Sequence, residues 1–428
     1  MSTTSREERI SGYLYALDGL RALSLLMIVT FHTWQQSWIS YYLRLNATTM
    51  LFNLDLFQRY GYVAIDSFFV LSGFCMFYPV ARDMFGERKF GGWKDFFIKR
   101  LRRIYPAYAM MLLLLLIFPK LSWITNGMTN PAEIAKHFLS HLFLVHTYNS
   151  ATLGSTISTA WTLPIETQFY LLLPLLCIPF RKKPLLTFLG MAIAGVGVRL
   201  GLMCYTDITQ MTIQAIPLGY LDVFGWGMIS AYFVVYIRNR VRNVQRLKPL
   251  MTLASAACLL AGLGYMIWLS KMRPPSGLSG GDVYFRFLYR GLFAAVMAGF
   301  LLTACFSYSF WERKIWGNRF FIFLSSISYT VYLWHQNIYI LLKRINVPYT
   351  TESPVMHDRH AMEGMTLLCL LSSLIIGVVV TKYIEGPIVR YGYKGCALKI
   401  WHGLRVLTGK KPSTAGTEDA EDTGAEAE

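Results

Sequence analysis

Long apolar stretches recur along almost the whole chain, separated by shorter polar loops. A helix needs about 20 apolar residues to cross the hydrocarbon core of a membrane. Ten stretches approach or reach that length, at residues 14–34, 61–80, 104–120, 161–180, 185–204, 216–237, 249–270, 287–309, 320–341 and 365–383. The pattern predicts an all-α polytopic integral membrane protein with about ten transmembrane helices. Residues 137–148 are apolar but too short to cross, so we expect a short interfacial or re-entrant helix there.

Basic residues between the apolar stretches predict the orientation. They cluster at residues 82–103, 181–183, 238–248, 312–319 and 390–411. Short basic loops stay on the cytoplasmic side of a membrane. Ten spans that start from a cytoplasmic N-terminus place all five clusters inside, whereas counting residues 137–148 as another span would place the later clusters outside. We therefore expect both termini to be cytoplasmic.

Composition agrees with this fold class. Of 428 residues, 54% are hydrophobic and 15% are charged, which is too apolar for a soluble protein. The net charge of +17 resides in the loops, so it indicates contact with membrane lipid and no nucleic-acid partner. The seven cysteines show neither CxxC nor metal-ligand spacing, so we expect no metal site and no disulfide framework.

Charge and hydropathy divide the chain into four regions. We expect a cytoplasmic N-terminus at residues 1–13 and a membrane domain at 14–390. A basic juxtamembrane segment follows at 391–411 and suits the inner leaflet. Residues 412–428 are acidic and small, without a core pattern, and predict a disordered tail.

Arg21 and His32 are the most informative polar residues, because they lie eleven positions apart in the first predicted span. At roughly 100° per residue this spacing returns both side chains to nearly the same helix face, roughly 16 Å apart along the axis. Ionisable residues inside a span are expensive and mark a pathway or a reaction site. The predicted orientation places Arg21 in the inner half and His32 near the outer end.

The same topology places Asp66, Glu166 and His335 near the depth of His32. An imidazole beside a carboxylate is a usable general base, so His32, Glu166 and Asp66 are candidate catalytic residues. The alternative is that these groups are hydrogen-bonded to each other and stabilise helix packing. For His32 the functional interpretation is favoured, for Asp66 and Glu166 the two are balanced, and His335 could equally be structural.

A second set of candidates lies on the cytoplasmic side, where Lys99, Arg100, Arg102 and Arg103 directly precede the third span. Arginines at the mouth of a helix bundle suit bidentate binding of phosphate. They are also ordinary topology signals that attract anionic lipid.

Two further groups carry weaker signals. Residues 68–74 (FFVLSGF) and 225–227 (GWG) contain small residues that allow close approach of helices, and packing is their expected role. A candidate sugar-binding mouth near the outer surface comprises Trp161, Arg199, Tyr205, Tyr220, Asp222, Arg286 and Arg290, together with His335. An aromatic belt at the membrane surface would also explain its tryptophan and tyrosines.

Six segments in order carry a resemblance to a known family. They are 17–22 (LDGLRA) with its Arg21-x10-His32 spacing, 66–74 (DSFFVLSGF), 99–106 (KRLRRIYP), 161–171 (WTLPIETQFYL), 328–336 (SYTVYLWHQ) and 385–387 (EGP). With these segments the chain resembles the membrane acyltransferase family 3 proteins. Members of that family O-acylate cell-surface polysaccharides, Nod factors and some macrolides.

The resemblance implies a function and assigns residues to it. The donor would be cytoplasmic acyl-CoA, most simply acetyl-CoA, used as a co-substrate with no bound cofactor. The acceptor would be a hydroxyl of a carbohydrate-containing molecule outside a bacterial cytoplasmic membrane. His32 resembles the family's essential histidine, Arg21 its partner, and Glu166 its tryptophan-glutamate motif. Arg100 and Arg103 resemble the arginines that hold coenzyme A.

The chain departs from the family pattern at two points. Thr167 stands where a second acidic residue is common, and we expect no fused SGNH esterase-like domain. Without such a domain, the protein could act alone on a small or lipid-linked acceptor, or pass the acyl group to a separate protein.

The expected mechanism places the phosphates of acyl-CoA at Arg100, Arg102 and Arg103, with Arg21 deeper along the channel. His32, oriented by Asp66 or Glu166, then acts as general base for direct attack of the hydroxyl on the thioester. A covalent acyl-enzyme is the alternative route. The competing function is a transporter or flippase for a lipid-linked sugar or small solute, for which polar residues inside spans are equally suitable.

Overall fold

The computed structural model describes residues 14–44, 50–119, 127–203, 216–272, 289–349 and 359–407. The predicted N-terminal segment at 1–13, the acidic tail at 412–428, and two members of the candidate sugar-binding mouth, Tyr205 and Arg286, lie outside the described residues.

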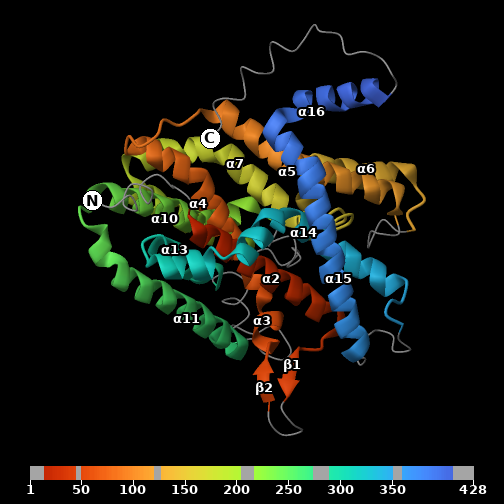
Figure 1. Ribbon diagram of the computed structural model, residues 1–428, viewed down its shortest axis with the longest axis horizontal. Coiled ribbons are helices and arrows are strands. Elements are labelled where there is room, and N and C mark those ends of the chain that lie inside the picture. The colour runs from red at the N-terminus through yellow and green to blue at the C-terminus, as the bar shows by residue number, and fades with distance from the viewer. Residues whose placement is uncertain are drawn as a thin grey trace.

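Each of the ten apolar stretches forms a helix where it is described. These helices are α2 (Tyr15–Ser37), α4 (Ala64–Met84), α5 (Trp93–Ile117), α7 (Thr162–Lys182), α8 (Pro184–Met203), α10 (Leu221–Arg240), α11 (Lys248–Met272), α13 (Tyr289–Ala304), α14 (Arg319–Arg344) and α15 (Arg359–Val380) (Figure 1). In the described part of the chain, the strands are those of a small antiparallel hairpin, formed by β1 (Tyr42–Arg44) and β2 (Met50–Asn53), which the sequence pattern did not predict.

Further helical segments complete the described chain. They are α3 (Asp55–Arg59), α6 (Pro131–Leu142), α16 (Gly386–Leu407), the 3₁₀ segments Gly61–Val63, His146–Tyr148, Ser158–Trp161, Pro217–Tyr220 and Val244–Leu247, and the π segments Phe310–Trp316 and Thr381–Glu385. The 12-residue α6 covers part of the stretch that was judged too short to cross. Asn130 caps its start by accepting a hydrogen bond from the Ala132 backbone.

Among the described residues, seven helices are long and apolar enough to cross a membrane. They contain α2, α4, α7, α8, α10, α11 and α15. Of the other predicted spans, α13 has only 16 described residues, while α5 begins with several charged residues and α14 carries serine, tyrosine, histidine and asparagine along its buried face. The protein is thus an integral membrane protein built from a helical bundle.

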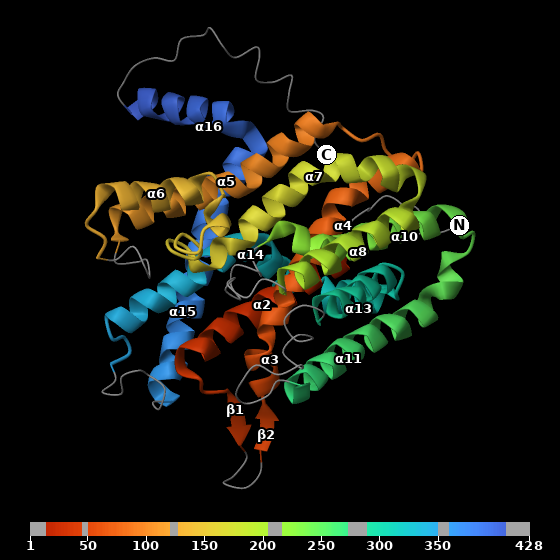
Figure 2. The same cartoon turned by 180° about the vertical axis from the view of Figure 1, so that it is seen from behind.

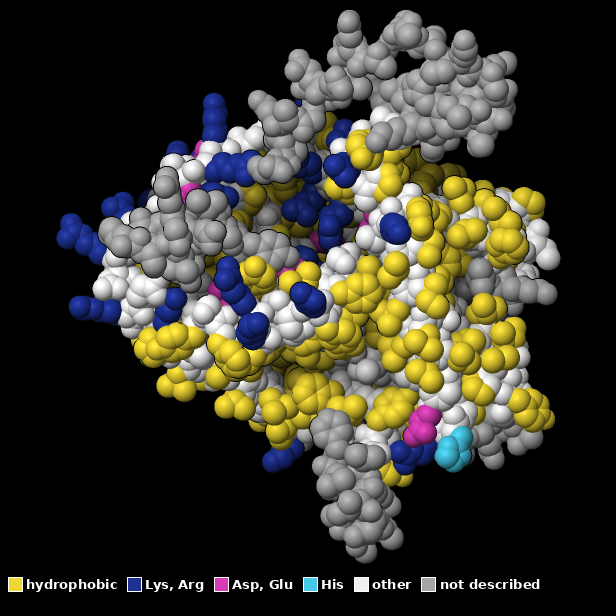
Figure 3. Space-filling view, viewed as in Figure 1, with side chains coloured by type: hydrophobic (Ala, Val, Ile, Leu, Met, Phe, Trp, Pro, Cys, Tyr) yellow, Lys and Arg dark blue, Asp and Glu magenta, His cyan; other side chains and the backbone are white. Residues whose placement is uncertain are grey.

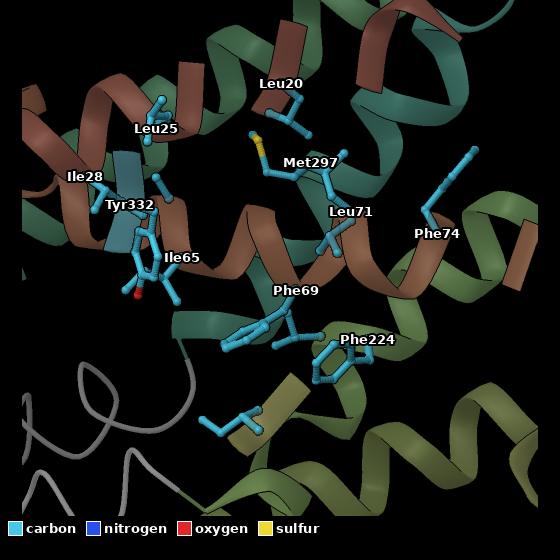
Figure 4. Close-up of a cluster of buried hydrophobic side chains, with 14 of the residues drawn as sticks. Leu20, Leu25, Ile28, Ile65, Phe69, Leu71, Phe74, Phe224, Met297 and Tyr332 are labelled. Atoms are coloured by element: carbon cyan, nitrogen blue, oxygen red, sulfur yellow. The ribbon is translucent and has the colours of Figure 1, made fainter. Parts of the chain in front are cut away.

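The core lies where α2, α4, α10, α13 and α14 converge (Figure 4). By contrast α8 and α11 lie at the periphery of the bundle (Figures 1 and 2). Most of their apolar side chains are exposed. Such exposure in a long apolar helix is typical of a lipid-facing position. The central position of α4 and α14 matters for function, because both carry candidate site residues.

Close contact between α4 and α10 depends on glycine. A Cβ atom at Gly73 would clash with the backbone of Phe224, and one at Gly227 would clash with the backbone of Val70. Gly73 and Gly227 belong to the FFVLSGF and GWG segments, for which packing was the expected role. The helices can approach this closely only because neither glycine has a side chain.

Charge is distributed unevenly over the surface. In the view of Figure 3, lysine and arginine side chains gather over the upper and left part, whereas the lower part and right flank are mostly hydrophobic. The C-terminal helix α16 bends at Gly392, whose φ of 68° is available to glycine at little cost. Beyond this kink the helix turns across the upper end of the molecule (Figure 1).

Candidate active site

A cavity of about 890 Å³, including the space at its open mouth, lies between α2, α4, α5, α7 and α14. Its lining residues are Arg21, Ile65, Phe68, Phe69, Leu71, Ser72, Cys75, Met76, Arg100, Arg103, Ile104, Thr162, Leu163, Glu166, Tyr170, Ser328, Tyr329 and Tyr332. Four of the residues that the sequence selected therefore share one cavity: Arg21, Arg100, Arg103 and Glu166.

Three arginines give the cavity a basic end. Arg100 and Arg103 are three residues apart on α5, so they lie on one face of that helix, and both line the cavity. Arg102 lies on another face, where a Cβ atom at Gly392 would be 2.8 Å from its guanidinium. The structure therefore places Arg102 against α16 rather than among the residues that line the cavity.

Arg21 reaches this cavity from α2. Its guanidinium lies 3.4 Å from the Ser325 hydroxyl and 3.8 Å from the Cys75 sulfur. The Ser325 hydroxyl in turn donates a hydrogen bond of 2.6 Å to Asp18. Since Asp18 and Arg21 are one turn apart, the carboxylate and the serine fix where the cation points.

The middle of the cavity carries Glu166. Ser72 on α4 donates a hydrogen bond to its carboxylate. Tyr170, one turn further along α7, also lines the cavity, and the Arg100 guanidinium lies 5.9 Å from the centre of its ring. With three arginines and a single carboxylate among the lining residues, the cavity has an excess of positive charge that suits an anionic ligand.

The other end of the cavity is apolar. This apolar end consists of Ile65, Phe68, Phe69, Leu163 and Tyr332. The Tyr332 hydroxyl donates a hydrogen bond of 2.8 Å to the Thr159 carbonyl. Figure 4 shows Ile65 of α4 and Tyr332 of α14 in the same cluster of buried side chains. The cavity is therefore polarised, with arginines at one end and aromatic side chains at the other.

Two histidines lie directly beyond Tyr332. The His335 ring centre is 5.9 Å from that of Tyr332 and 5.2 Å from that of His32. Arg21 contacts Ser325 and His32 contacts His335, so both members of the Arg21–His32 pair face α14, as their spacing predicts. These contacts also show that α2 and α14 run in the same direction.

The hydrogen bonds of the two histidines define their chemistry. His32 Nδ1 lies 2.9 Å from Gln35 Oε1, and His335 Nδ1 lies 3.1 Å from the Val331 carbonyl. Both partners are oxygens that can only accept, so each Nδ1 carries the proton and each Nε2 is left as an acceptor. Among the described residues, the buried His335 Nε2 has no hydrogen-bond partner. The pair is thus arranged to accept protons.

Asp66 pairs with an arginine rather than with His32, the partner expected from the sequence. It is fully buried and forms a 2.6 Å ion pair with Arg290 of α13. Glu166 bonds to Ser72, so the described contacts place neither carboxylate on His32, and Gln35 takes the orienting position instead. Hydrogen bonding to an amide oxygen selects the same tautomer without adding a charge to the bundle.

Arg199 belongs to a second buried ion pair. Its guanidinium donates two hydrogen bonds to Asp222, at 2.7 and 2.6 Å, and only 4% of the residue is exposed. Trp161 lies 6.5 Å from the ring of Tyr220, which in turn lies under the Arg290 guanidinium. These contacts place Arg199 within the helix packing between α8 and α10, whereas Trp161 remains half-buried at the start of α7.

Several cavity residues were not assigned to the site from the sequence, although a signal was present. Phe68, Ser72 and Met76 follow one another at intervals of four on α4, which is the spacing of one helix face. Tyr329 and Tyr332 are three residues apart on α14, which also places them on one helix face. Gln35 could have been found from its position one turn after His32. Without knowing which helices are neighbours, these helix faces could not be distinguished from faces that only pack against other helices.

Comparison with known proteins identifies the family. The acyltransferase domain of the acyltransferase 3 family matches residues 14–383. The chain belongs to the acyltransferase 3 family. The resemblance drawn from the sequence motifs is thereby confirmed, and the cavity and both histidines lie within the acyltransferase domain.

The curated relatives of this acyltransferase 3 family member include cell-wall enzymes. The chain is 24% identical over 412 residues to peptidoglycan O-acetyltransferase OatA of Listeria monocytogenes, covering 92% of this chain and 58% of that protein. It is also 24% identical over 406 residues to "Putative peptidoglycan O-acetyltransferase YrhL" of Bacillus subtilis, covering 91% and 57%. The chain thus spans less than two thirds of the length of these relatives. No solved structure matches it significantly.

Proposed function

We propose that the protein is a membrane O-acyltransferase, most simply an O-acetyltransferase, that moves an acyl group from acyl-CoA to a carbohydrate hydroxyl. The observation that carries the proposal is the polarised cavity, whose apolar end includes Tyr332, with its ring centre 5.9 Å from that of His335 in the His32–His335 pair. Acyl-CoA has the same polarity, with phosphates at one end and an uncharged thioester at the other. The family and the names of the relatives support the reaction type.

In this proposal Arg100 and Arg103 hold the phosphates of the donor, and Arg21 neutralises charge deeper in the cavity. Arginine suits this role because its planar guanidinium can donate two parallel hydrogen bonds to a phosphate. Arg102 is left out of the donor site because its guanidinium lies beside Gly392. Glu166 lies between the cations and the apolar end, where its bond to Ser72 keeps it within the cavity wall.

His32 is proposed as the general base. Its Nε2 accepts the proton of the acceptor hydroxyl while the hydroxyl oxygen attacks the thioester carbonyl. The tetrahedral intermediate then expels the thiolate of coenzyme A, which takes the proton from the imidazolium. Gln35 holds the reactive tautomer, and the adjacent His335 offers a second acceptor to the incoming hydroxyl.

We further propose ten crossings with both termini in the cytoplasm of a bacterial cell. The basic loops and the cavity arginines then share the inner side, and the histidine pair lies toward the outer side. Peptidoglycan-type glycan is the first acceptor to test, since the relatives are named for it.

The test uses the purified protein in proteoliposomes with labelled acetyl-CoA and muropeptides. We expect an ester-linked acetyl group on the glycan and its loss in the His32→Ala variant. Full activity of that variant would contradict the general-base assignment. Transport of a lipid-linked glycan without any acyl transfer would replace the proposal by the transporter function.

A further inference from the structure

We propose that the apolar end of the cavity sets the length of the acyl group that is transferred, with Phe68 as the side chain that excludes chains longer than acetyl. This inference rests on the proposed function, because it treats the cavity as the donor site. It adds a specificity element that neither the family nor the names of the relatives define.

The polarity of the cavity fixes where the acyl group lies. The lining arginines Arg21, Arg100 and Arg103 form the basic end of the cavity, and Glu166 lies between them and the apolar end. A donor whose phosphates bind the arginines can only point its uncharged end toward the opposite wall. The acyl chain is then the part of the donor that meets Phe68 and its neighbours.

Two of the aromatic residues at this end are held rigidly. The Phe69 ring packs 4.8 Å from Tyr220 and 5.1 Å from Phe224, and only 3% of the residue is exposed. Tyr332 is anchored by its bond to the Thr159 carbonyl, and the Thr162 hydroxyl lies 3.1 Å from its oxygen. A densely packed wall of this kind does not move aside for extra methylene groups.

Phe68 differs from these two residues. It is only half-buried, its ring centre lies 6.2 Å from that of Tyr332, and its hydrocarbon ring has no polar anchor. Its neighbour Tyr332 lies 5.9 Å from His335, so the Phe68 ring stands close to where the thioester would meet the histidines. Truncating Phe68 therefore enlarges the cavity where a longer acyl chain would need space.

The experiment measures kcat/KM for acetyl-, butyryl- and hexanoyl-CoA with the full chain in proteoliposomes. We expect the wild-type protein to prefer acetyl-CoA, and Phe68→Ala to raise the butyryl-to-acetyl ratio by about tenfold or more, the usual effect of one or two methylene groups in an apolar site. Phe68→Leu and Leu163→Ala enlarge the same end and should shift the ratio in the same direction.

Phe74→Ala is the matched control. It makes the same truncation on α4, but Phe74 is fully buried beside Tyr78 and does not line the cavity, so the ratio should stay at the wild-type value. An unchanged ratio in Phe68→Ala, Phe68→Leu and Leu163→Ala, with acetyl transfer retained, would overturn the inference while leaving the proposed function intact. Equal use of acetyl- and hexanoyl-CoA by the wild-type protein would do the same. Absence of transfer from every acyl-CoA would instead reject the proposed function, and the inference with it.

Discussion

Arg100, Arg102 and Arg103 lie within a single turn of α5, yet the structure separates their environments. Arg100 and Arg103 face the cavity, whereas Arg102 faces α16. Helical geometry accounts for this difference, because three steps return nearly to the same face and two steps do not. A cluster of like charges in the sequence therefore does not act as a unit.

Donor binding should reflect this difference. We predict that Arg103→Gln raises the KM for acyl-CoA by about tenfold or more, since a charge-assisted hydrogen bond contributes about 1.5–3 kcal/mol. Arg102→Gln should change that KM by less than about threefold. Steady-state kinetics with varied acyl-CoA in proteoliposomes compares the two variants, and an equal effect of both would contradict the proposed donor site.

The histidine pair makes a second prediction at this scale. Gln35→Leu removes the acceptor that holds the Nδ1 proton of His32, so we expect kcat to fall by about tenfold while the KM for acyl-CoA stays close to wild type. Gln35→Glu keeps an acceptor at the same position and should restore part of the activity. A rise in KM without a change in kcat would instead indicate a role in donor binding.

At the scale of elements, the contact between α4 and α10 supports the cavity from behind. α4 supplies Phe68, Ser72 and Cys75 to the cavity, and its opposite face meets α10 at Gly73. Backbone atoms of Phe224 occupy the space that a side chain at this position would need. The position of α4 at the cavity therefore depends on Gly73 and Gly227, neither of which lines the cavity.

We predict that Gly73→Ala destabilises the protein by about 1–3 kcal/mol, because the backbone it meets cannot rotate away. Gly264→Ala on α11 is the control, since no atom lies within 4 Å of the added Cβ and alanine favours the helix by up to about 1 kcal/mol. Thermal unfolding in detergent, followed by tryptophan fluorescence, should show a lower midpoint only for the first variant. Equal midpoints would mean that α4 and α10 can move apart at Gly73 without a loss of stability.

A second link between α4 and α10 is polar and lies just after the end of α4. Glu87 accepts hydrogen bonds from Arg82, Arg238 and Asn239. Burial by itself raises the pKa of Glu87, but the hydrogen bonds from Arg238 and Asn239 and the Arg238 charge outweigh it, so the pKa lies below its usual value. The ionised carboxylate thus connects the two helices.

The lowered pKa of Glu87 makes its contribution to folding stability dependent on pH. The stabilisation is fully present above the ordinary glutamate pKa and is lost as the pH falls through the lowered value. We predict that Glu87→Gln lowers the melting temperature at pH 7 and that the difference from wild type shrinks toward pH 4. Glu133→Gln on the exposed start of α6 makes the same substitution at a single helix end and serves as control, so it should lower the melting temperature at pH 7 by less than Glu87→Gln does.

At the scale of the whole molecule, the arrangement separates two chemical environments. Arg21 and the histidine pair lie at different levels along the parallel helices α2 and α14, roughly 16 Å apart by the rise of a helix. A donor and an acceptor could therefore enter from opposite sides of a membrane. Sidedness is then a property of the complete bundle rather than of one residue.

This sidedness can be measured with membrane vesicles of known orientation. Acyl-CoA does not cross a membrane by itself, so we predict acyl transfer when it is added to inside-out vesicles and none with right-side-out vesicles. Permeabilising the right-side-out vesicles with detergent should restore transfer and controls for the amount of protein. Equal transfer by both intact preparations would contradict a donor site that opens only to the cytoplasm.

The sequence by itself determined the helices, the family and the four charged residues that line the cavity. Apolar runs specify membrane helices because a lipid environment leaves the backbone no other way to satisfy its hydrogen bonds across the bilayer. The eleven-residue spacing placed Arg21 and His32 on one face, and both indeed contact α14. Such local rules need no knowledge of neighbouring helices.

Only the tertiary structure decided the partners. Asp66 pairs with Arg290, 224 positions away, and Glu166 bonds to Ser72, 94 positions away, so no local pattern could assign either carboxylate. The same holds for His335 beside His32, and for the aromatic end of the cavity. Which polar group meets which depends on how the helices pack around one another, and that packing is set by all their faces together.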